Sequence, residues 1–89
     1  MDVTSYLALE TIFTDWRDGD EHGWETEFDW LEANHAEQMA VLVESIREHG
    51  IREPVLLGGD GRVWDGHHRI CAARSLGLSM IPVEFVGIP

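Results

Sequence analysis

The fold of this chain is decided by residues 65–73, which read Asp65-Gly66-His67-His68-Arg69-Ile70-Cys71-Ala72-Ala73. The run opens a helix that we expect over residues 67–76, with Gly77 just beyond its end. The first turn of such a helix has unpaired backbone amides and the positive end of the helix dipole, so it attracts an anion. Gly66 permits close backbone approach, and the forked guanidinium of Arg69 can hold a phosphate oxygen.

Two histidines complete this candidate phosphate site. His67 and His68 can add hydrogen-bond donors, more strongly once protonated. The same residues also fit the ordinary polar start of a helix. This alternative stays open because short motifs often match by chance. His67 and Cys71 have a spacing that two metal ligands can use, but no third ligand is obvious nearby. We therefore expect no resident metal site, and residue order alone leaves any catalytic residue unknown.

Upstream of the motif, a second helix is indicated. Asn34 and Glu37 fit a capping box, and the apolar residues that follow recur at three- and four-residue spacing. Gly50 fits the left-handed position that ends such a helix. Residues 51–54 then read as an extended segment.

Short strands flank the motif on both sides. Residues 55–57 read as a buried strand, 58–61 as a glycine-rich hairpin turn and 62–64 as a return strand. Residues 81–86 form a last strand, in which Pro82 indicates a sheet edge or a strand start.

The first third of the chain is the acidic part. Residues 1–34 hold ten acidic residues against one arginine, whereas residues 35–89 hold seven against five, and the whole chain has a formal net charge of −11. A nucleic-acid binder normally has a basic stripe, so we expect weak or no binding to duplex DNA. The acidic surface is either a solvated face or a surface that meets a basic protein partner.

The periodicity of this acidic third is less clear. Residues 4–14 fit a short strand or a short helix, and residues 15–23 read as a loop. Residues 24–31 fit either structure and favour a helix. We expect at least two of its three tryptophans, Trp16, Trp24 and Trp30, in the core, because so small a domain is short of apolar mass.

Length and composition limit the number of domains, the disulfides and the location of the protein. The 89 residues suffice for one small domain, and the lone Cys71 cannot form an internal disulfide. No signal peptide or membrane-spanning stretch is visible, so we expect a cytoplasmic protein without a membrane partner.

Three motifs, in order, resemble the ParB/sulfiredoxin superfamily over about half of the chain. Ser45-Ile46, Gly50-Ile51 and Pro54-Val55 are similar to the ParB helix-to-strand segment. Residues 65–73 resemble the ParB Gly-Glu-Arg-Arg box and its Gly-His-His-Arg variant. The closing Leu-Gly and Ile-Pro-Val of residues 76–83 resemble the ending of the same domain.

The resemblance implies an α/β (α+β) fold with a small mixed sheet flanked by helices. Residues 35–89 would form the nucleotide-binding core, and the acidic residues 1–34 would pack on it or extend it. The implied ligand is a nucleoside triphosphate, CTP or ATP, with Mg²⁺. The implied binding residues are Gly50, Ile51, Pro54, Asp65, Gly66, His67, His68 and Arg69.

At some positions this sequence differs from the motifs of the family, and these differences argue against some of the family's activities. His67 stands where sulfiredoxin has its catalytic cysteine and where ParB has a glutamate, so reductase chemistry is not expected and hydrolysis is in doubt. The helix-turn-helix of ParB is not expected in this chain. Three functions stay open: a stand-alone nucleotide binder that acts through protein contacts, a metal-dependent ParB-like nuclease or NTPase, and an acidic protein-interaction or DNA-mimic module with a vestigial pocket. The small acidic chain also suggests an accessory product of a phage or mobile element.

Overall fold

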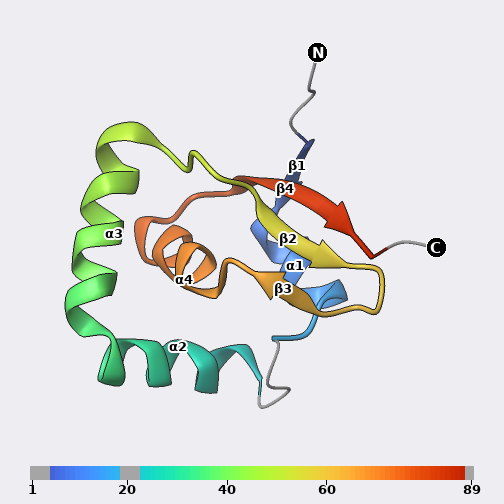
Figure 1. Ribbon diagram of the computed structural model, residues 1–89. Helices are drawn as coiled ribbons and strands as arrows, with labels where there is room; N and C mark the ends of the chain where they lie inside the picture. The colour runs from blue at the N-terminus through green and yellow to red at the C-terminus, as the bar shows by residue number, and fades with distance from the viewer. Residues whose placement is uncertain (1–4, 19–22, 88–89) are drawn as a thin grey trace.

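The computed structural model describes residues 5–18 and 23–87, and it contains a four-stranded sheet and four helices in that part (Figure 1). In chain order the elements are β1 (Ser5–Ala8), α1 (Leu9–Asp15), α2 (Trp24–Asn34), α3 (Ala36–His49), β2 (Val55–Gly58), β3 (Val63–Asp65), α4 (His67–Leu76) and β4 (Met80–Val86).

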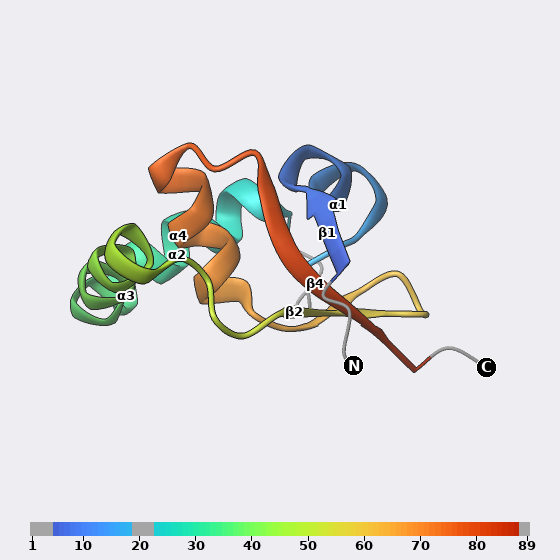
Figure 2. The ribbon, with the colours of Figure 1, turned by 90° about the horizontal axis from the view of Figure 1, so that it is seen from above.

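The sheet is mixed, with strand order β1-β4-β2-β3. β4 pairs antiparallel with β1 and parallel with β2, and β2 pairs antiparallel with β3. The parallel pair needs a crossover connection, and α4 supplies it between β3 and β4. Figure 2 shows the helices gathered on one side of the sheet, and no described helix covers the other side. The predicted small mixed sheet flanked by helices is confirmed.

The local signals around the motif are also confirmed. α4 has the predicted bounds, residues 67–76, and α3 ends at His49 as expected. Gly50 and Gly77 follow these two helices at φ 74° and 71°, in the left-handed region that favours glycine. The predicted hairpin joins β2 to β3.

Two local predictions are wrong. The capping box at Asn34 does not form, because Asn34 is the last residue of α2 and its side-chain amide donates to the Trp30 carbonyl at 2.9 Å. His35 separates α2 from α3 instead. For Pro82 the sheet-edge alternative is wrong, since β4 is a central strand. Pro82 lies near the start of β4, opposite Tyr6 and before the first residue that pairs with β2.

The N-terminal third is part of the same sheet and core. Residues 4–14 fit both a strand and a helix because they form both, β1 and then α1. Of the predicted loop 15–23, residues 19–22 lie outside the described part, and Arg17 forms an isolated parallel bridge with Arg62. Residues 24–31 lie in the helix α2, as favoured. Phe28 and Leu31 of this helix are each 2% exposed.

The tryptophans divide as expected for a small domain. Trp16 and Trp24 are partly buried against the core, whereas Trp30 is 48% exposed. The indole N–H of Trp16 donates to the Gly58 carbonyl at 3.1 Å, so it also ties the N-terminal third to β2.

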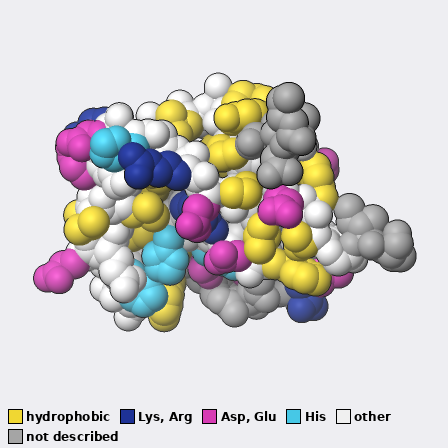
Figure 3. Space-filling view, turned by 45° about the horizontal axis from the view of Figure 1, so that its top comes forward, with side chains coloured by type: hydrophobic (Ala, Val, Ile, Leu, Met, Phe, Trp, Pro, Cys, Tyr) yellow, Lys and Arg dark blue, Asp and Glu magenta, His cyan; other side chains and the backbone are white. Residues whose placement is uncertain are grey.

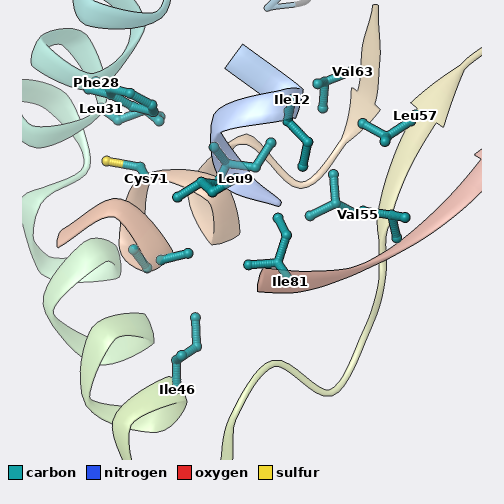
Figure 4. Packing of buried hydrophobic residues seen from close by; sticks show 14 of the residues in the cluster. Leu9, Ile12, Phe28, Leu31, Ile46, Val55, Leu57, Val63, Cys71 and Ile81 are labelled. Carbon is teal, nitrogen blue, oxygen red and sulfur yellow. The ribbon is translucent and has the colours of Figure 1, made fainter. Parts of the chain in front are cut away.

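One apolar cluster joins the sheet and all four described helices, and Figure 4 shows how its side chains meet. α4 lies between the sheet and α3 in Figure 1. Its Ala72 and Ala73 are fully buried, and their small side chains let the helix approach its neighbours closely. The buried members of the cluster are Leu9, Ile12, Phe28, Leu31, Met39, Ile46, Val55, Leu57, Val63, Ile70, Cys71, Ala72, Ala73, Ile81 and Val83.

Candidate functional site

The start of α4 is shaped by Gly66. Its φ is 111°, and a Cβ at this position would lie 2.9 Å from Val55 Cγ2 and 3.2 Å from Arg69 Nη2. Any other residue would be strained by its backbone and would also press on β2. No side chain in the described part of the chain caps this helix, so the amides of its first turn are available to an anion.

Arg69 is held over the helix start by two carboxylates. Its Nη1 lies 3.2 Å from Glu53 Oε2, and its Nη2 lies 3.3 Å from Asp65 Oδ2. The Arg69 side chain is only 15% exposed, while those of Glu53 and Asp65 are 84% and 70% exposed. The guanidinium is therefore held at the helix start, and an incoming phosphate would compete with two solvent-exposed carboxylates.

Three adjoining hollows form a groove between α3 and the start of α4, which we call the α3–α4 groove. The hollow at the helix start has a volume of about 340 Å³, the one beside Gly50 about 230 Å³ and the one along α3 about 660 Å³. All three share Leu42. Figure 3 shows acidic, basic and histidine side chains side by side on this part of the surface. The polar side chains that line the groove are Glu37, Gln38, Ser45, Arg52, Glu53, Asp65, His68 and Arg69.

His68 and His35 form a hydrogen-bonded pair of nearly parallel rings at one side of the groove. The two rings are 10° from parallel with centroids 5.1 Å apart, and His35 Nδ1 lies 2.9 Å from His68 Nε2. Burial, followed by the charges of His35 and His67, lowers the pKa of His68 below its usual value. The pair thus shares a hydrogen bond in which at least one ring is neutral, which opposes the expectation of a protonated donor at residue 68.

Most of the predicted binding residues line the groove. Gly50, Ile51 and Arg69 line its second hollow, and Asp65, Gly66, His68 and Arg69 line its first. The other two, Pro54 and His67, line none of the three hollows. The ring of His67 instead lies 6.1 Å from that of Trp24, between centroids.

Several residues of the groove escape sequence reasoning. Glu53 lies between Gly50-Ile51 and Pro54-Val55 of the helix-to-strand motif, but its contact with Arg69 spans 16 residues of sequence. Leu42 and Ser45 of α3 line the groove, the first as an apolar and the second as a polar side chain. His35 has no such signal, because its contact with His68 spans 33 residues of sequence.

Cys71 lies one turn beyond the motif and faces the core. It is 1% exposed, and burial together with Glu32 raises the pKa of its thiol to about 11. A protonated, enclosed thiol is a weak nucleophile, so Cys71 acts as a small packing residue. Within residues 5–18 and 23–87, no three His, Cys, Asp or Glu side chains come together as a metal site.

The mixed sheet with its helices on one face has the fold of a solved ParB-N domain. The fold matches the solved structure of a Pnob8-like ParB-N domain with a TM-score of 0.62 at 17% sequence identity, over 93% of this chain and 29% of that one. In sequence, 47 residues are 45% identical to the ParB-like nuclease domain-containing protein YnaK of Escherichia coli (strain K12).

The match to YnaK covers 53% of this chain and 54% of YnaK, so the chain spans about half the length of this relative. No family model matches the sequence. The chain thus has the fold of a ParB-N domain and is similar in sequence to a ParB-like protein, which agrees with the resemblance of the three motifs. None of its described helices is long and apolar enough to cross a membrane.

Proposed function

We propose that this ParB-like domain binds a nucleoside triphosphate, CTP or ATP, in the α3–α4 groove, with its phosphates at the start of α4. The observation that carries the proposal is the position of Arg69, fixed beside the uncapped first turn and at the junction of two hollows. The amides of residues 67–69 and the Arg69 guanidinium would hold the phosphate oxygens.

The charge balance of the groove supports a metal-bound form of the ligand. Three carboxylates, Glu37, Glu53 and Asp65, line it against two guanidiniums, Arg52 and Arg69, which leaves one net negative charge. A bare triphosphate would meet this excess of negative charge, whereas a Mg²⁺ complex carries less charge and adds a cation for the carboxylates. We therefore expect Mg²⁺ to strengthen nucleotide binding.

Calorimetric titration with the four nucleoside triphosphates, with and without Mg²⁺, tests the proposal. The Arg69→Ala variant removes a charge-assisted contact and should weaken binding by about ten- to a hundredfold, on the basis of roughly 1.5–3 kcal/mol for such a bond. Arg47→Ala is the matched control, because Arg47 is 60% exposed on α3 and pairs with Glu44 rather than lining the groove. It should bind like the wild type.

The proposal is wrong if the wild-type protein binds no nucleotide, pyrophosphate or sulfate at low millimolar concentrations.

A nuclease or NTPase is the second candidate, because YnaK is named for a ParB-like nuclease domain. We expect negligible hydrolysis of nucleotides or DNA, since His67 replaces the ParB glutamate. Cleavage with Mg²⁺ or Mn²⁺ that is lost in both His68→Ala and Asp65→Ala would put the nuclease first.

A further inference from the structure

The face of the sheet opposite the helices carries a patch of exposed apolar side chains. Residues alternate between the two faces of a strand, and Val55, Leu57, Val63, Ile81 and Val83 point into the core. Their neighbours point outward. We call the resulting surface the outer face. Its exposed or half-buried members are Tyr6, Leu56, Trp64, Met80 and Glu84, and the buried Pro82 lies on the same face of β4.

The outer face exposes large side chains from three of the four strands, and Leu56 of the fourth strand, β2, is half-buried. Tyr6 is 60%, Trp64 53% and Met80 51% exposed. Figure 3 shows hydrophobic side chains over the strands, with an acidic side chain among them. Large exposed apolar patches with a polar rim are typical of interaction sites.

Trp64 is positioned on this face by close packing. A Cβ at Gly58 would lie 2.0 Å from Trp64 Nε1, and one at Gly87 would lie 2.5 Å from Trp64 Cη2, so the indole rests on two glycines. The indole N–H donates to Asp60 Oδ1 at 3.1 Å. The ring is therefore held flat and half exposed, which suits an interface anchor because little freedom is lost on binding.

Glu84 places a carboxylate in the middle of this apolar surface. It is exposed on the central strand β4, its register partner on β2 is Leu56, and Pro82 precedes it on the same face. Within the described residues the side-chain carboxylate of Glu84 has no hydrogen bond or ion pair, although its backbone pairs in the sheet. An unpaired carboxylate among apolar groups favours a cationic side chain from a partner, since burial without one would be costly.

We propose that the outer face binds a protein partner that presents a Lys or Arg side chain within an apolar patch, with the cation at Glu84 and the apolar groups against Tyr6 and Trp64. A second copy of this chain fits poorly, because a symmetric contact between outer faces brings Glu84 near its own copy and joins two molecules of charge −11. A nucleic acid is repelled by the same charge. The proposal uses none of the groove residues and does not depend on nucleotide binding.

The test follows NMR shifts of the labelled full chain during titration with a short peptide of alternating leucine and lysine. A peptide with glutamate in place of lysine is the control probe. We expect saturable shifts at the Trp64 indole N–H and the amides of β4 with the lysine peptide, none with the glutamate peptide, and weaker binding as salt rises.

Paired variants distinguish specific binding at the outer face from non-specific attraction between the acidic protein and a basic peptide. Glu84→Gln should weaken peptide binding by about two- to fivefold, as expected for loss of an exposed ion pair. Glu10→Gln removes the same charge from α1, on the helical side, and should change it far less. Tyr6→Ser should weaken binding more than Trp30→Ser, which removes an aromatic ring of α2 that is 48% exposed.

Three outcomes would overturn the proposal. They are shifts centred on α2 or α3, equal effects of Glu84→Gln and Glu10→Gln, and absence of saturable binding at millimolar peptide. Self-association at micromolar concentration that Glu84→Gln strengthens would make the outer face a contact between copies instead. Nucleotide titrations of the same variants should match the wild type, so that failure of either proposal is recognised separately.

Discussion

Gly66 is the residue at which the backbone of the site is most constrained. A Gly66→Ala substitution combines a φ of 111° with a Cβ 2.9 Å from Val55 Cγ2. We expect it to lower the free energy of unfolding by about 2–5 kcal/mol, from backbone strain of about 1–2 kcal/mol together with overpacking of about 1–3 kcal/mol. Urea denaturation followed by circular dichroism measures this loss.

Gly77→Ala is the matched control for that substitution. Gly77 ends the same helix at φ 71°, but a Cβ there would meet nothing within 4 Å. It should cost only the backbone strain of about 1–2 kcal/mol. Equal losses in the two variants would show that the contact with Val55 is not what requires glycine at residue 66.

His68 makes the stability of the domain depend on pH. Its pKa in the folded protein is lowered, first by burial and then by the charge of His35, so the folded state binds fewer protons than the unfolded state below about pH 6.5. Neutral His68 makes its full contribution to the stability of the folded protein above this pH. That contribution is lost as the pH falls from the pKa of the unfolded state to the lower pKa of the folded state. The urea concentration at the unfolding midpoint should therefore be lower at pH 5.5 than at pH 7.5.

The His68→Asn variant should flatten this dependence. His49→Gln should leave the slope unchanged, because His49 is exposed at the end of α3 and lies beside Glu48 rather than another histidine. An unchanged slope in His68→Asn would assign the pH effect to other groups.

At the scale of elements, α2 shows that the acidic third is not an appendage. Phe28 is 2% exposed, contacts the rings of Phe13 and Trp24, and lies 4.6 Å below the Arg74 guanidinium. We expect Phe28→Ala to cost about 3–5 kcal/mol, enough to unfold much of a domain of marginal stability. Trp30→Ala on the same helix should cost about 1 kcal/mol or less, because that ring is largely outside the core. Similar thermal stability of the two variants would contradict a core shared with α2.

At the scale of the whole molecule, charge decides which macromolecules can approach. With a net charge of −11, the domain has no basic stripe that could release counterions from duplex DNA. We expect no binding to random-sequence duplex at about 150 mM salt, with or without nucleotide, in fluorescence anisotropy titrations. Micromolar sequence-independent binding, the level of non-specific binders, would restore a role on DNA.

The sequence by itself determined the parts of this protein whose causes are local. α4, its glycine start and the glycine after α3 depend on helix periodicity, unpaired amides and positive φ, all of which act within a few residues. The three short motifs around them were enough to indicate the ParB-like fold.

Only the tertiary structure decided what depends on distant partners. Residues 5–15 divide into a strand and a helix because Ser5–Ala8 pairs with β4, almost the whole chain away. Pro82 lies in a central strand for the same reason. Glu53 reaches Arg69 across 16 residues and His35 reaches His68 across 33, so no local pattern encodes either contact. The charge and the hydrogen bonding of the groove thus arise from packing, which brings together side chains that sequence order keeps apart.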